Sequence, residues 1–162
     1  PMKKILVSLL ICVVAFTSFR KAPATTTAPL PFCVALAAVM KAEPSAFKTL
    51  RGTYISDNTD GTKNYTSKVS FAGWPSNRYE TTDAGGVNID IKSKLTTQDK
   101  ATQLFADTEK QIADCTAIKG ETLVAEGIDK LMIFTKNKCD VALILVTKEE
   151  ESYVMISISR AS

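Results

Sequence analysis

The fold of this chain is decided by the stretch KLMIFTKNKCDVALILVTKEEESYVMISIS, residues 130–159. The stretch is rich in β-branched and other apolar residues, and two short polar runs interrupt it. This pattern predicts three strands, over residues 129–135, 140–147 and 152–159. Because LMIF and VALILV are apolar at every position, we expect these strands to be covered on both faces, as central strands are.

Two further strands are predicted upstream of this stretch. Residues 68–71 and 87–92 alternate between polar and apolar side chains, as half-buried strands do. Between them, residues 73–86 contain many turn-forming residues, although residues 78–82 could pair within a hairpin.

Apolar residues at helical spacing predict two helices. The first covers residues 32–52 and is expected to kink or restart at Pro44, which cannot donate a backbone hydrogen bond. Either Thr96 or Thr97 caps the second helix, whose apolar stripe includes Cys115. The order of the elements therefore predicts an α+β fold, with two helices packed on one face of an antiparallel sheet of about five strands.

The N-terminal residues have the features of an export signal. Two lysines precede ILVSLLICVVAF, residues 5–16, an apolar run of the length found in signal-peptide cores and too short to span a bilayer comfortably. We interpret residues 1–22 as a signal peptide, 23–31 as a linker rich in Pro, Thr and Ala, and 32–162 as a single α+β domain. A periplasmic or secreted protein is expected, with membrane contact only through the uncleaved leader. A buried N-terminal helix is the alternative.

The charge balance argues against nucleic-acid binding. The chain has 20 Lys and Arg against 17 Asp and Glu, and four of the basic residues lie within residues 1–21. Removal of that segment leaves 16 basic residues and no basic stripe that could neutralise phosphates.

Three cysteines follow the leader. In an oxidising compartment, Cys33, Cys115 and Cys139 can form one disulfide and leave one thiol. We expect Cys115 to pair with Cys139, because the first lies near the end of a helix and the second at the start of a strand a short connection later. Three buried, reduced thiols are the alternative.

The sequence lacks the residues of several common catalytic sites. It contains no histidine, which excludes Ser-His-Asp and Cys-His catalysis and imidazole zinc sites. It also contains no CxxC motif and no glycine-rich phosphate loop. We therefore predict no catalytic residue, no metal ligand and no cofactor. Carboxylate pairs could act without histidine, but Asp90 and residues 149–151 are better explained as solvated surface.

One cluster of residues could form a binding surface. Trp74, Arg78 and Tyr79 lie close together in the chain, and these residue types often anchor interfaces. We predict that a ligand or partner, such as a protein or an envelope component, binds there. The alternative is that Trp74 packs over an edge of the core and Tyr79 pairs across a hairpin.

The chain resembles uncharacterised small exported proteins of Gram-negative bacteria in three segments: the leader, the polar linker and AFKTLRG, residues 46–52. The element order is similar to that of the type III secretion chaperone-like fold, and this similarity implies binding through a sheet or helix face. The sequence thus favours an exported, non-enzymatic binding or interaction module. The alternatives are a histidine-free hydrolase or lyase that uses carboxylate and lysine chemistry, and a structural envelope protein.

Overall fold

The computed structural model describes residues 28–58, 61–81, 86–148 and 151–161. In these residues two α-helices pack against one eight-stranded antiparallel sheet, so the fold class is α+β but the expected sheet of about five strands is wrong. The helices are α1 (Phe32–Lys41) and α2 (Gln98–Thr116). The strands are β1 (Arg51–Asp57), β2 (Lys63–Ser67), β3 (Ser76–Thr81), β4 (Val87–Lys92), β5 (Glu121–Leu123), β6 (Lys130–Lys136), β7 (Cys139–Val146) and β8 (Tyr153–Arg160).

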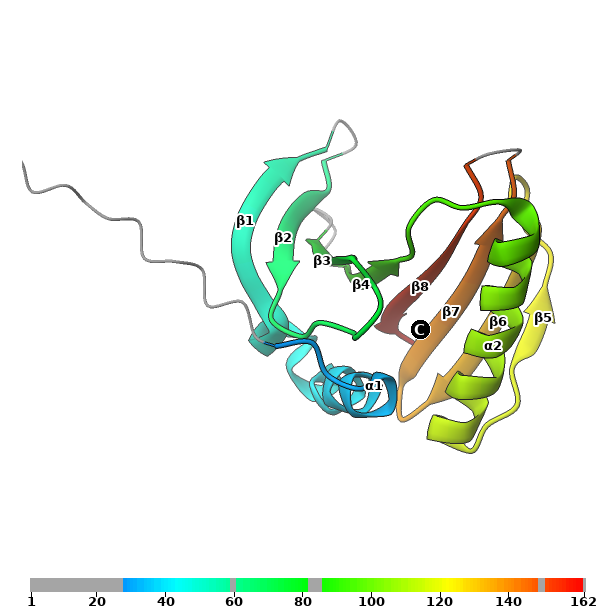
Figure 1. Cartoon of the computed structure of the whole chain (residues 1–162). Helices are drawn as coiled ribbons and strands as arrows, with labels where there is room; N and C mark the ends of the chain where they lie inside the picture. The colour runs from blue at the N-terminus through cyan, green and yellow to red at the C-terminus, as the bar shows by residue number, and fades with distance from the viewer. Residues whose placement is uncertain (1–27, 59–60, 82–85, 149–150, 162) are drawn as a thin grey trace, which may run out of the picture.

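The sheet consists of two halves joined between β4 and β8. Its strand order is β1-β2-β3-β4-β8-β7-β6-β5, so each half is an antiparallel meander of four strands. A helix precedes each meander in the chain, α1 before β1 and α2 before β5. Figure 1 shows the sheet curving from β1 on one side to β5 on the other, with α2 lying across the second half and α1 below the junction.

The two helices share one hydrophobic core with one face of the sheet. On β7, alternate residues point toward the helices, and Val141 and Leu143 are fully buried there. Ile156 of β8 and Ile91 of β4 continue the same layer across the junction. From the helix side, the layer is completed by Leu36, Val39, Phe105 and Ile112.

The strands missed from the sequence are β1, β2 and β5. Their residues are largely polar and partly exposed, with no run of apolar alternation. β1 and β5 are the two edges of the sheet, and β2 lies next to the edge strand β1. Residues 68–71 form no strand, contrary to the prediction. Phe71 makes only an isolated bridge with Leu30, and the Leu30 amide donates to the Ser70 carbonyl at 2.8 Å.

The first helix is much shorter than the predicted range of 32–52. It ends at Lys41, and Pro44 lies in a 3₁₀ turn (Glu43–Ser45) that follows, so the helix does not continue through the proline. Ala46 and Phe47 then have positive φ angles of 51° and 58°, which turn the chain toward β1. In the described residues, neither helix is long and apolar enough to cross a membrane.

Candidate functional site

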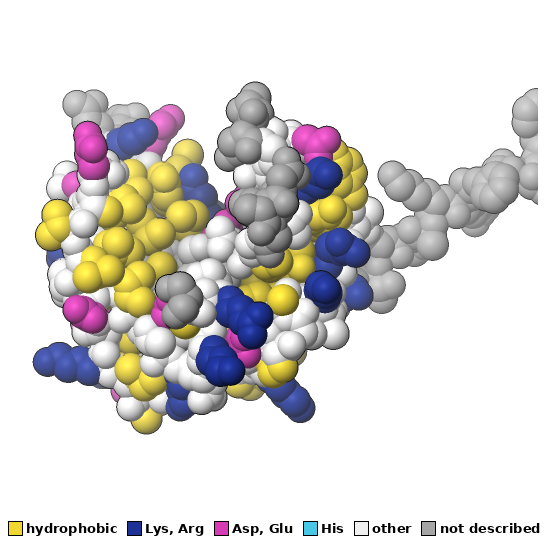
Figure 2. Space-filling model, turned by 180° about the vertical axis from the view of Figure 1, so that it is seen from behind, with side chains coloured by type: hydrophobic (Ala, Val, Ile, Leu, Met, Phe, Trp, Pro, Cys, Tyr) yellow, Lys and Arg dark blue, Asp and Glu magenta, His cyan; other side chains and the backbone are white. Residues whose placement is uncertain are grey.

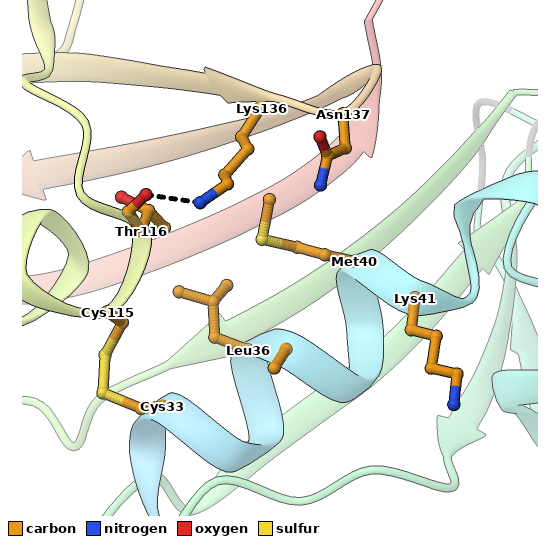
Figure 3. Close-up of a pocket in the computed structure, with 9 residues that line it drawn as sticks. Cys33, Leu36, Met40, Lys41, Cys115, Thr116, Lys136 and Asn137 are labelled. Carbon is orange, nitrogen blue, oxygen red and sulfur yellow. Dashed lines mark hydrogen bonds between the residues drawn. A yellow bond between two sulfur atoms is a disulfide. The ribbon is translucent and has the colours of Figure 1, made fainter.

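A half-open pocket lies between α1, the C-terminal end of α2 and the β6–β7 turn (Figure 3). Its volume is about 370 Å³, which is within the range of small-molecule sites. We call it the α1–α2 pocket. Its lining residues are Cys33, Leu36, Ala37, Met40, Lys41, Cys115, Thr116, Lys136 and Asn137.

A disulfide between Cys33 and Cys115 closes one end of this pocket. Cys33 lies near the start of α1 and Cys115 near the end of α2, and their Cα atoms are 5.3 Å apart. The bond therefore joins the two helices that form the pocket walls.

The predicted pairing of Cys115 with Cys139 is therefore wrong. Cys139 begins β7 on the face that the helices cover, where it is fully buried and lies 3.9 Å from the carbonyl oxygen of Met40. Cys115 faces α1 instead. The prediction relied on the short sequence distance between Cys115 and Cys139. The actual partner, Cys33 on α1, lies 82 residues before Cys115 in the chain.

The polar groups of the pocket come from the end of α2 and from a tight turn. The Lys136 ammonium donates a hydrogen bond to the Thr116 carbonyl at 2.5 Å, and so satisfies one of the free carbonyls at the end of α2. Asn137 and Lys138 have φ angles of 52° and 62°, as a two-residue hairpin turn requires. This turn places Lys136 and Asn137 beside each other at the pocket (Figure 3).

The apolar wall of the pocket is one side of α1. Leu36 is buried, Met40 is half-buried and Ala37 is exposed, and all three line the cavity. The apolar residues whose spacing predicted this helix therefore also form part of the pocket wall.

Behind α1, the buried thiol of Cys139 lies near the acidic residues Glu43 and Asp140. The Glu43 carboxylate is buried and pairs with the Arg160 guanidinium at 2.8 Å. Burial, followed by the negative charges of Glu43 and Asp140, raises the pKa of Cys139 to about 11. The thiol is therefore protonated near neutral pH, and its environment does not favour a nucleophile.

The opposite face of the sheet, which we call the open face, is covered by no helix among the described residues. On β7 it carries Ile144 and Val146, which are nearly buried but lie outside the core cluster. Leu131 and Met155 pair with Ile144 from the neighbouring strands, and Tyr153 pairs with Val146. Figure 2 shows a large hydrophobic area on this side of the molecule.

The open face becomes polar toward β3. Arg78, Asp90 and Ser157 lie directly opposite one another on β3, β4 and β8, and the Ser157 hydroxyl donates to Asp90 at 2.5 Å. Burial raises the pKa of Asp90 above its ordinary value, while the hydrogen bonds with Ser157 and Glu80 and the charge of Arg78 act in the opposite direction.

The predicted binding residues lie on different sides of the sheet. Trp74 and Tyr79 are only 8% and 1% exposed and belong to the core, where Tyr79 stacks edge-on against Tyr65. Arg78 is exposed on the open face, beside Asp90. The structure therefore does not bring the three side chains together, and binding of a partner at Arg78 stays a prediction.

Sequence reasoning missed the α1–α2 pocket because its residues come from three distant segments. One signal could have indicated it, since Cys33 and Cys115 each lie on a predicted helix and a bond between them would place the helices side by side. Among the described residues, no three His, Cys, Asp or Glu side chains form a group that could hold a metal ion. Comparisons of the chain with protein-family models, with curated proteins and with solved structures find no match.

Proposed function

We propose that this protein is an exported, non-enzymatic module that binds a small ligand in the α1–α2 pocket. The observation that carries the proposal is a cavity of about 370 Å³ with an apolar wall on α1 and a few polar groups at its other side. Small-molecule sites commonly have this composition. Export is supported by the features of the leader, and the Cys33–Cys115 disulfide is consistent with an oxidising compartment.

The walls of the pocket are held in place by contacts of different kinds. The disulfide joins α1 to α2, the Lys136–Thr116 hydrogen bond joins β6 to α2, and the two-residue turn sets the position of Asn137. A site whose walls are already in position loses less conformational entropy when a ligand binds. This preorganisation supports a binding role.

A blocking substitution tests the proposal. Ala37 is an exposed residue of α1 that lines the pocket, so Ala37→Phe should fill the cavity without disturbing the core. Ala106→Phe is the matched control, because Ala106 is an exposed helical alanine of α2 that does not line the pocket. We expect octanol, titrated into ¹⁵N-labelled protein, to shift the amide signals of the pocket residues in the wild type and in the control but not in Ala37→Phe. Equal shifts in all three proteins would contradict the proposal, as would the absence of shifts in the wild type with octanol and also with its charged analogues.

A second candidate function rests on the polar end of the open face. Asp90 has a raised pKa and lies beside Arg78 and Ser157, an arrangement that supports acid–base chemistry without histidine. A panel of hydrolase and lyase substrates tests this alternative, with Asp90→Asn as the inactive variant. If no substrate is turned over faster by the wild type than by Asp90→Asn, the enzymatic alternative fails.

A further inference from the structure

We infer that the ligand of the α1–α2 pocket is a small amphipathic anion, with its negative group at Lys136 and its apolar chain along α1. This inference rests on the proposed function and adds the chemical class of the ligand. Three features of the pocket carry it: the net charge of the lining, the position of the free hydrogen-bond donors, and the size of the cavity.

The lining of the pocket has a positive net charge. It includes Lys41 and Lys136 and contains no acidic residue. The C-terminal ends of α1 and α2 lie here too, and each helix end carries the equivalent of roughly half a negative charge. Two lysines therefore outweigh two helix ends by about one positive charge. An anion is favoured over a cation at this site.

The donors lie at one end of the cavity and the apolar surface at the other. One ammonium proton of Lys136 is used by the Thr116 carbonyl, so two remain for a ligand. Figure 3 shows Lys136 and Asn137 reaching toward the side chains of Leu36 and Met40 across the pocket. Lys41 extends away from them, so it contributes charge at the rim rather than a contact. This separation matches a ligand with one charged end and one apolar end.

The size of the cavity selects a small ligand. A volume of about 370 Å³ is near the lower end of the range of roughly 300–1,000 Å³ for ligand pockets. A medium-chain carboxylate free in solution fits this range better than a whole membrane lipid. We therefore choose octanoate as the probe.

Three probes of equal chain length separate charge recognition from apolar binding. Octanoate, octanol and octylammonium are titrated into the full chain and followed by the amide signals of the pocket residues. We expect octanoate to bind about tenfold more tightly than octanol, because a charge-assisted hydrogen bond is stronger than a neutral one. Octylammonium should bind most weakly of the three probes. Added salt should weaken the binding of octanoate but not that of the other two probes.

Substitutions at Lys136 locate the charged group. Lys136→Gln should remove most of the preference for octanoate, whereas Lys136→Arg, which keeps the charge and can still donate to Thr116, should retain it. Lys100→Gln makes the same charge change near the start of α2, about 24 Å along the helix axis from Thr116 at the pocket. This control variant should keep the preference for octanoate. Octanol binding reports whether each variant keeps an intact pocket.

The outcomes distinguish failure of this inference from failure of the proposed function. If the three probes bind equally well, or if Lys136→Gln keeps the full preference for octanoate, the pocket binds ligands but does not select anions. If no probe shifts the pocket signals, the proposed function fails and this inference fails with it. A preference that disappears in Lys136→Gln and persists in Lys100→Gln establishes the anion site.

Discussion

Cys139 and Asp90 lie on opposite faces of the sheet, and burial raises the pKa of both. Cys139 is covered by α1 and lies among core residues, whereas Asp90 is part of the open face. The same physical cause therefore has opposite consequences. Burial keeps the Cys139 thiol neutral and unreactive. The same effect lets the Asp90 carboxyl group hold a proton at a higher pH than usual.

The first prediction concerns the reactivity of Cys139. With a pKa of about 11, only about one thiol in a thousand is ionised at pH 8. We expect iodoacetamide at pH 8 to leave the native protein unmodified at Cys139 and to label this residue after unfolding in urea. Mass spectrometry of the tryptic peptide measures the label. Rapid labelling of the native protein would contradict the burial described here.

The second prediction is a pH dependence set by Asp90. Because its folded pKa is raised, the stability that the protonated carboxyl contributes is present below its ordinary pKa of about 4 and is lost as the pH rises through the raised value. Asp90→Asn removes this loss, so the variant should gain stability relative to the wild type between pH 3 and pH 7. Urea unfolding at several pH values measures the difference. Asp114→Asn, at an exposed position of α2, is the control, and a gain of the same size there would contradict the assignment.

Among the structural elements, α2 and the strands β6, β7 and β8 were predicted from the sequence. The predicted ends of the three strands lie within about one residue of the observed ends. They are long, and their apolar residues repeat with a clear period. The edge strands β1 and β5 carry no such pattern, because only part of their surface is covered and polar residues are tolerated there. The length of α1 was overestimated because the turns after it also bury apolar residues, such as Phe47 and Leu50.

The third prediction concerns the end of α2. Ala117, which follows the helix, has a φ angle of 57°, a left-handed conformation that glycine adopts without steric cost. Ala117→Gly should therefore stabilise the protein by about 0.5–1 kcal/mol, after allowance for the greater freedom of glycine in the unfolded chain. Thermal unfolding measures the change.

Ala106→Gly is the control for this prediction. Ala106 lies within α2 and is exposed, so glycine there should destabilise the protein by about 1 kcal/mol. Loss of stability in both variants would show that the left-handed conformation of Ala117 carries no steric cost.

For the whole molecule, the Cys33–Cys115 disulfide links residues 82 positions apart and connects the helix of the first half to the helix of the second. The two halves also pair through β4 and β8, so the bond reinforces an association that the sheet already makes. Closing a loop of this length in the unfolded chain is a large entropic constraint.

The fourth prediction follows from this constraint. Replacing Cys33 and Cys115 together by serine should lower the free energy of unfolding by up to about 4.5 kcal/mol, as the chain-entropy model gives for a loop of this length. Either single serine variant should cost a similar amount, whereas Cys139→Ala should cost less. Urea unfolding under non-reducing conditions measures the loss. A peptide that links Cys115 to Cys139 in a non-reduced digest would overturn the pairing.

The sequence by itself determined the α+β class, the central strands and the exclusion of histidine chemistry, because these depend on local periodicity and on which residue types are present. Only the tertiary structure decided the number of strands, the partner of Cys115, the burial of Trp74 and the presence of the α1–α2 pocket. Each of these depends on contacts between segments far apart in the chain, such as α1 against the end of α2. Such contacts leave no local pattern in the sequence, since they arise from how complete elements pack together.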